Sequence, residues 1–340
     1  MSIKKREYKI LSRSLFMENQ TSPLAAQFEL TQRCNLKCQH CYLTGAALKK
    51  EMGFNKVCRA IDKLSQEGCF WLCFTGGEPL LREDFCDIYT YAYKKGFLIT
   101  VFTNATLVNK KIANLFFRLS PFCVETTFNA ATKNTFDNIT GVKGSFLQAL
   151  SGIKLMHDLN IPLKLKCQAM TLNYKELSLM RKLYRKFGSK FYCSTLIDPS
   201  INGSLAPCKL RLDERRLKSI FSSRNNPADI DRAQDCKDKK LYSCGMGRWN
   251  IYIDPSARFS FCNLLRKPGF DLFKSSLENS FRVVSDVQSA YEAKLNKKCL
   301  ACNFKQSCRN CPARAWLELK DKSGIVDYFC RLAKLGKSDN

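Results

Sequence analysis

The feature that most constrains the fold is a regular alternation of short apolar runs and helix-like segments between residues 25 and 196. Short apolar runs bounded by glycines or turn residues are typical of buried strands, and the segments between them carry apolar residues at helical spacing. Such alternation indicates βα units and a parallel sheet. The predicted strands cover residues 25–30, 70–74, 98–102, 123–128, 163–170 and 191–196. The predicted helices cover residues 52–68, 85–95, 110–119, 144–159 and 174–187.

Six strands are too few to close an eight-stranded barrel, so we predict an α/β fold with an open, partial (β/α)6 barrel. The alternation ends at residue 197, where turn residues and then a charged stretch follow. The predicted divisions are a basic N-terminal extension (1–23), the partial barrel (24–205), a bridging region (206–240) and a small cysteine-rich domain with a β-hairpin and short helices (241–335).

The composition favours a cytoplasmic protein that binds metal. Hydrophobic residues make up 45% of the 340 residues, but no stretch approaches the length of a membrane span. The first twenty residues lack the apolar region of a signal peptide, so we expect no membrane association. Nineteen cysteines in a chain of this size favour metal ligation over a disulfide framework.

The formal charge of +26, from 56 Lys and Arg against 30 Asp and Glu, would attract acidic partners. The basic residues are spread along the chain, without an arginine-rich block or an aromatic-interleaved motif. Nucleic-acid binding is therefore the less favoured interpretation of this charge.

Three cysteines directly after the first predicted strand form the pattern C-x3-C-x2-C: Cys34, Cys38 and Cys41, with His40 before the last. Three thiolates in one short loop can hold three irons of a [4Fe–4S] cube and leave the fourth iron open to another ligand. A zinc knuckle and three buried cysteines are the alternatives.

A second motif, Gly76-Gly77-Glu78-Pro79, follows the second predicted strand. Sites in parallel sheets lie at the carboxyl ends of strands, so this motif should face the cysteine loop. Adjacent glycines let the backbone approach a ligand closely, and Glu78 or its backbone can meet an ammonium group. A simple tight turn is the alternative.

Together the two motifs resemble those of the radical S-adenosylmethionine (SAM) enzymes. The resemblance implies that Cys34, Cys38 and Cys41 bind the cluster and that SAM chelates the open iron. One electron then cleaves SAM to methionine and a 5′-deoxyadenosyl radical. The methionyl amine would be held by Gly76, Gly77, Glu78 and Pro79. His40 occupies the aromatic position of the loop.

Two weaker matches extend the predicted SAM site. Asn104 resembles the family's Thr-Asn-Gly position, although Ala105 stands where glycine is usual, and an ordinary turn residue is the alternative. Thr127 matches the hydroxyl position that reaches the SAM ribose, with a plain strand residue as the alternative. The segment 140–146 is similar to the "TG-x-x-GSF" helix entry of peptide-modifying members.

The C-terminal cysteines resemble those of the SPASM domain, which binds two auxiliary [4Fe–4S] clusters. The last interval of the central quartet has two intervening residues, where the domain usually has three. Zinc is the alternative metal for paired C-x2-C units. The resemblance implies one cluster on Cys236, Cys244, Cys262 and Cys311, and a second on Cys299, Cys302, Cys308 and Cys330.

The resemblance predicts an enzyme that abstracts a hydrogen atom from a peptide or protein, in the maturation of a ribosomally made peptide. An acidic leader peptide would suit the basic charge, and a flavodoxin or ferredoxin would supply electrons. Asn263 stands where sulfatase maturases carry an acidic base, which disfavours that substrate class. The alternatives are a small-molecule substrate, such as a haem precursor or an alcohol, and a zinc-ribbon nucleic-acid binder without enzymatic activity.

Overall fold

The computed structural model describes residues 22–45, 49–222, 249–293, 297–305 and 307–335. Two predicted cluster ligands, Cys236 and Cys244, and most of the predicted N-terminal extension lie outside these residues. Within them, no helix is both long and apolar enough to cross a membrane.

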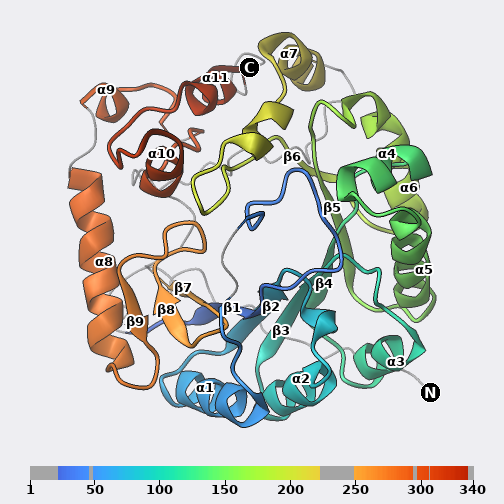
Figure 1. The fold of residues 1–340 in the computed structure, drawn as a ribbon, viewed down its shortest axis with the longest axis vertical. Helices are drawn as coiled ribbons and strands as arrows, with labels where there is room; N and C mark the ends of the chain where they lie inside the picture. The colour runs from blue at the N-terminus through green and yellow to red at the C-terminus, as the bar shows by residue number, and fades with distance from the viewer. Residues whose placement is uncertain (1–21, 46–48, 223–248, 294–296, 306, 336–340) are drawn as a thin grey trace.

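Six parallel strands form the first part of the sheet, in the order β6-β5-β4-β3-β2-β1. Figure 1 shows the helices α1 to α6 along the outer side of this curved sheet. The predicted α/β class and partial barrel are thereby confirmed. The strands are β1 (Ala25–Thr31), β2 (Trp71–Gly76), β3 (Leu98–Thr103), β4 (Cys123–Thr127), β5 (Leu163–Gln168) and β6 (Tyr192–Ser194). The helices are α1 (Phe54–Gln66), α2 (Phe85–Lys94), α3 (Lys110–Arg118), α4 (Lys133–Thr140), α5 (Ser145–Asp158) and α6 (Leu177–Lys186).

The outer face of the sheet is apolar and packs on these helices. In β2, Leu72 and Phe74 are buried, whereas Trp71 and Cys73 on the other face are partly exposed. This alternation follows from the two-residue period of a strand. The partly exposed face is the inner face of the partial barrel.

Within the partial barrel, one helix was not predicted, and one predicted helix is divided. The segment of α4 has the sequence KNTFDNIT, whose Asn and Thr residues have weak helix propensity. The predicted helix 174–187 consists of a 3-10 turn, η3 (Tyr174–Glu176), followed by α6.

The sheet continues beyond β1 into the C-terminal part of the chain. The predicted division placed the hairpin in the cysteine-rich domain, but β7 (Asn250–Ile253) pairs in parallel with β1. The antiparallel strands β8 (Arg258–Ser260) and β9 (Gly269–Asp271) follow, and the sheet has nine strands. Pairing with β7 removes the free edge that β1 would otherwise present.

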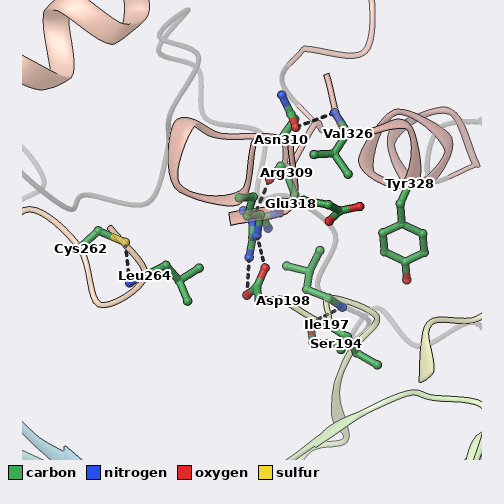
Figure 2. A network of polar contacts seen from close by, with 12 residues as sticks. Ser194, Ile197, Asp198, Cys262, Leu264, Arg309, Asn310, Glu318, Val326 and Tyr328 are labelled. Carbon is green, nitrogen blue, oxygen red and sulfur yellow. Dashed lines mark hydrogen bonds and ion pairs between the residues drawn. The ribbon is translucent and has the colours of Figure 1, made fainter. Parts of the chain in front are cut away.

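The remaining C-terminal helices lie opposite β4 and β5 in Figure 1. An ion pair between Arg211 and Glu318, 2.7 Å long, connects the segment after β6 to α10, and the Tyr328 hydroxyl donates to the Thr195 carbonyl. Figure 2 shows Glu318 and Tyr328 in this part of the structure. The remaining helical elements are η2 (Pro79–Leu81), η4 (Ala206–Leu210), α7 (Glu214–Ser222), α8 (Leu277–Ala293), α9 (Lys297–Leu300), α10 (Pro312–Leu319) and α11 (Asp327–Leu335).

Candidate active site at the carboxyl ends of the parallel strands

The cysteine loop, residues 34–41, follows β1 and is held against the end of α4. The Lys37 N–H donates a 2.8 Å hydrogen bond to the Thr140 carbonyl. Gly141 ends α4 in the left-handed region at φ +65°, and a Cβ there would lie 3.1 Å from the Lys37 carbonyl oxygen. The Thr-Gly pair singled out in the sequence therefore supports the cysteine loop.

The thiols of Cys34, Cys38 and Cys41 lie close enough to influence one another's charge. Burial raises the pKa of Cys38 to about 12, and the charges of Cys41 and Cys34 add to the effect. Burial likewise raises the pKa of Cys34 to about 11 and that of Cys41 above its usual value. These thiols are protonated near neutral pH, and metal binding would release their protons.

A recurring backbone contact stabilises negative charge on the sulfurs. The Sγ atoms of Cys34, Cys262, Cys302 and Cys308 each lie 3.4 Å from the backbone nitrogen two residues further along, whose N–H donates to the sulfur. Figure 2 shows the contact at Cys262. Hydrogen bonds to sulfur favour the thiolate that ligates iron. This donor set fits the predicted clusters.

The described residues contain no group of three or more His, Cys, Asp or Glu side chains arranged to hold a single metal ion. A [4Fe–4S] cube differs from such a site, because each of its thiolates binds a different iron.

The two glycines of the second motif pack against the end of β1. A Cβ on Gly76 would lie 2.4 Å from the Thr31 carbonyl oxygen, and one on Gly77 would lie 2.3 Å from that of Arg33. From the sequence, these glycines were predicted to let the backbone approach a ligand closely. In the structure the close neighbour is the protein's own backbone, so any side chain here would separate the motif from the cysteine loop.

Glu78 connects the ends of β2 and β3 through a buried carboxylate. It accepts hydrogen bonds from the Thr103 hydroxyl at 2.8 Å, the Asn104 N–H at 2.7 Å and the Leu80 N–H at 3.1 Å. Burial raises the pKa of Glu78 to about 7, although these hydrogen bonds lower it. Its side chain thus contacts protein donors, and Pro79, also buried, begins η2.

Asn104 extends the connection to the cysteine loop. Its Nδ2 donates to Asn35 Oδ1 at 3.0 Å and lies 3.9 Å from Cys34 Sγ. Ala105, where the related motif has glycine, is in the left-handed region at φ +62°. That conformation costs an alanine roughly 1–2 kcal/mol, which explains why glycine is usual there.

His40 lies beside the end of β4. Asn129 Oδ1 accepts from the Gln168 N–H at 2.9 Å, so its Nδ2 faces His40 Nε2 at 3.2 Å and donates to it. Burial lowers the pKa of His40 to about 4, so the ring is neutral and Nδ1 carries its proton. Thr127, the predicted ribose contact, ends β4 two residues before Asn129.

Four C-terminal cysteines, Cys299, Cys302, Cys308 and Cys330, form one group. Burial raises the pKa of Cys308 to about 11, and the charges of Cys330, Cys299 and Cys302 raise it further. Burial also raises the pKa of Cys330, with contributions from Cys299 and Cys302. These are the four residues that the resemblance assigned to one auxiliary cluster.

Cys262 and Cys311 form a second group, although 49 positions separate them in the sequence. Both pack against the same small apolar cluster. Next to them is the buried guanidinium of Arg314, which interacts with both sulfurs and is held by Asp198 at 2.6 Å. Figure 2 shows Asp198 and Cys262 in this part of the structure.

A buried polar network, which the sequence motifs did not predict, lies between the two cysteine-bearing segments. Glu29, fully buried in β1, accepts hydrogen bonds from the Tyr252 hydroxyl and from Arg266 at 3.2 Å. Burial raises the pKa of Glu29, although Arg266 opposes the shift. Burial also raises the pKa of Tyr42, which bonds to Asn263. A glutamate within a mostly apolar predicted strand was the available signal.

We compared the chain with protein-family models and with known proteins. Residues 28–177 match the family model described as the radical SAM superfamily. The chain is 27% identical over 305 residues to the subtilosin biosynthesis protein AlbA of Bacillus subtilis, covering 85% of this chain and 67% of that protein. It is 22% identical over 333 residues to the AdoMet-dependent heme synthase of Methanosarcina barkeri, covering 88% of this chain and 94% of that protein.

Two solved structures have a similar fold. Streptococcus suis SuiB bound to its precursor peptide SuiA superposes with a TM-score of 0.72 at 14% identity, covering 91% of this chain and 76% of that one. Native anSMEcpe with bound AdoMet superposes with a TM-score of 0.68 at 17% identity, covering 92% of this chain and 96% of that one. At such identities the similarity concerns the fold.

Proposed function

Because the chain belongs to the radical SAM superfamily and is an enzyme of that type, we propose that it abstracts a hydrogen atom from a peptide as part of that peptide's maturation. Peptide-modifying proteins recur among its relatives: AlbA acts in subtilosin biosynthesis, SkfB is a sporulation killing factor maturation protein, and MftC is a mycofactocin maturase. The roles of these three relatives support a peptide substrate for this chain.

In this proposal Cys34, Cys38 and Cys41 hold the SAM-binding [4Fe–4S] cluster. When bound, the cluster would supply the one electron that cleaves SAM to methionine and the 5′-deoxyadenosyl radical. The chain's own residues position the motif. Gly76 and Gly77 let it lie against the end of β1, and Glu78, through its hydrogen bond with Asn104, holds it in a fixed position relative to the cysteine loop. Gly76 to Pro79, Asn104, Thr127 and His40 are the proposed SAM contacts.

The C-terminal cysteines are the proposed ligands of two auxiliary [4Fe–4S] clusters. Cys262 and Cys311, with Cys236 and Cys244, would hold one of them. The quartet Cys299, Cys302, Cys308 and Cys330, in which the other three charges raise the pKa of Cys308, would hold the other. We retain the predicted domain divisions as part of this proposal, with the addition that β7 to β9 extend the barrel sheet.

Two partners complete the proposal. A flavodoxin or ferredoxin would deliver the electron. The formal charge of +26 would attract an acidic leader peptide at a rate that falls with ionic strength.

The observation that supports this function best is the packing of the cysteine loop on the carboxyl ends of the parallel strands, next to Gly76-Gly77-Glu78. The test uses anaerobically reconstituted, reduced enzyme with SAM and small peptides encoded beside its gene. We expect 5′-deoxyadenosine together with a change in peptide mass. Deoxyadenosine without any change in those peptides would contradict the peptide assignment.

A haem precursor is the second candidate substrate. The similarity to the M. barkeri heme synthase spans 94% of that protein, a larger share than for AlbA. Iron-coproporphyrin in the same assay distinguishes the candidates, because a loss of porphyrin mass with no change in peptides would favour haem synthesis.

A further inference from the structure

The inner face of the sheet carries a compact charged cluster that none of the predicted SAM contacts includes. It consists of Glu125 on β4 and of Lys164 and Lys166 on β5. Lys164 Nζ lies 3.3 Å from Glu125 Oε1, and Lys166 Nζ lies 2.9 Å from Oε2. One carboxylate therefore bridges two ammonium groups, and the cluster has a net charge of +1.

Aromatic rings fix the position of both ammonium groups. Lys164 Nζ lies 4.2 Å from the centre of the Tyr192 ring, and Lys166 Nζ lies 3.6 Å from that of Phe102. Cation–π contacts of this kind hold a charge without neutralising it. Among the residues that the structure describes, Glu125 is the only carboxylate within ion-pair distance of either lysine.

Solvent reaches the cluster. The side chains of Lys164 and Lys166 are 34% and 30% exposed, and that of Glu125 is 19% exposed. Each ammonium has three N–H donors, and Glu125 accepts from only one of them. The cluster therefore has donors and net positive charge available for a second anion.

The cluster also lies close to the proposed site of radical formation. Lys166 pairs in register with Thr127, the proposed ribose contact, on the neighbouring strand. Glu125 precedes Thr127 by two residues and so lies on the same face of β4. Val124, on the opposite face of β4, is buried in the hydrophobic core, whereas Glu125 and Thr127 are half-buried on the inner face of the partial barrel.

We propose that Lys164 and Lys166, spaced by Glu125, bind a carboxylate of the substrate peptide, that of an aspartate or glutamate, inside the partial barrel. This inference rests on the proposed function, since it specifies the substrate of the same site. The anchored carboxylate would fix which residue of the peptide lies near Thr127. The site thereby selects peptides with an acidic residue at a set distance from the modified position.

A graded series of charge variants tests the proposal. The double variant Lys164→Gln/Lys166→Gln changes the cluster from +1 to −1, and Glu125→Gln changes it to +2. The control Lys154→Gln/Lys186→Gln removes two exposed lysines from α5 and α6 and so matches the change in total charge. Iron content and thermal stability show whether each variant is folded and loaded.

The probe is a displayed library of random decapeptides, selected for binding to reconstituted enzyme in the presence of SAM. We expect the unmodified enzyme and the control to enrich Asp or Glu at one position. The cluster double variant should lose that enrichment by about tenfold or more, the effect of one charge-assisted hydrogen bond. Glu125→Gln should keep or increase it.

Three results would overturn the proposal: no acidic preference in the unmodified enzyme, equal loss in the control, or unchanged enrichment in the cluster double variant. The dissociation constant of SAM is measured in parallel, because SAM also has a carboxylate. A tenfold weakening of SAM binding in the cluster variant would assign the lysines to SAM and contradict a peptide site. If peptides bind but the reduced enzyme forms no deoxyadenosine, the proposed function fails, and this inference fails with it.

Discussion

The backbone N–H of Asn104 donates a 2.7 Å hydrogen bond to the carboxylate of Glu78, which joins the end of β3 to the end of β2. Through the side chain of Asn104 the same connection reaches Asn35 in the cysteine loop. Three segments distant in sequence are thus held in one arrangement by hydrogen bonds around a buried acid. The predictions that follow test this arrangement and its counterpart at the C-terminal cysteines.

Gly77→Ala should separate the second motif from the cysteine loop. The new Cβ would lie 2.3 Å from the Arg33 carbonyl oxygen, which is backbone and cannot move aside cheaply. We expect the free energy of unfolding to fall by about 3 kcal/mol or more, as for other strained core substitutions. Gly53→Ala is the control, because no atom lies within 4 Å of the added Cβ. Urea unfolding measures both, and equal effects would contradict the packing argument.

Glu78 should make stability depend on pH. Burial raises its pKa from 4.5 to about 7, so the folded protein holds this proton more tightly than the unfolded chain. Its contribution to stability is therefore fully present below pH 4.5 and is lost as the pH rises through about 7. The total change is about 3 kcal/mol, at 1.36 kcal/mol per pKa unit. Glu78→Gln should flatten this part of the profile, and an unchanged slope in the variant would contradict the assignment.

The ion pair between Arg314 and Asp198 should be important for docking the C-terminal helices. Both side chains are largely buried, at 16% and 20% exposure, and lie 2.6 Å apart. Removal of one partner, as in Asp198→Asn, leaves a buried charge and should cost about 3 kcal/mol or more. The exposed pair of Arg331 and Asp327, 52% and 82% exposed, provides the control. Asp327→Asn should change stability by less than about 1 kcal/mol, and similar losses at both sites would exclude a special role for Arg314.

Iron content should follow the cysteine groups. Three cubes predict about twelve iron and twelve sulfide atoms per chain, because each cube holds four of each. Replacement of Cys34, Cys38 and Cys41 together by alanine should remove about a third of the iron, and replacement of the quartet Cys299, Cys302, Cys308 and Cys330 another third. Zinc in place of iron and sulfide in anaerobically purified protein would instead support the zinc alternative.

The sequence predicted local structure better than long-range packing. The parallel strands follow from alternating apolar runs, and the structure confirms that these strands form a parallel sheet. The sequence did not predict that β7 pairs with β1, because no local sequence pattern identifies a strand partner more than 200 residues away. It also missed α4, whose Asn- and Thr-rich sequence becomes helical in a tertiary setting that includes the cysteine loop.

The glycines illustrate the same limit within the site. The pair Gly76-Gly77 was recognised from its residue types, but the reason for it, contact with the carbonyls of Thr31 and Arg33, needs the register of two strands. Glu29 and Glu125 stand out in the sequence as charges within predicted strands, but a charge in a strand identifies a buried pair only once its partners are known. Their partners, Arg266 and the two lysines of β5, lie far away in sequence.

The most direct test of the account is whether reduced, reconstituted enzyme converts SAM to 5′-deoxyadenosine. We predict slow formation without substrate, measured by liquid chromatography under anaerobic conditions. The triple alanine variant at Cys34, Cys38 and Cys41 should form none, whereas Cys308→Ala, which alters the other cysteine group, should retain part of the activity. If the unmodified enzyme carries its full iron and forms no deoxyadenosine, or if the triple variant forms as much as the unmodified enzyme, the account is wrong.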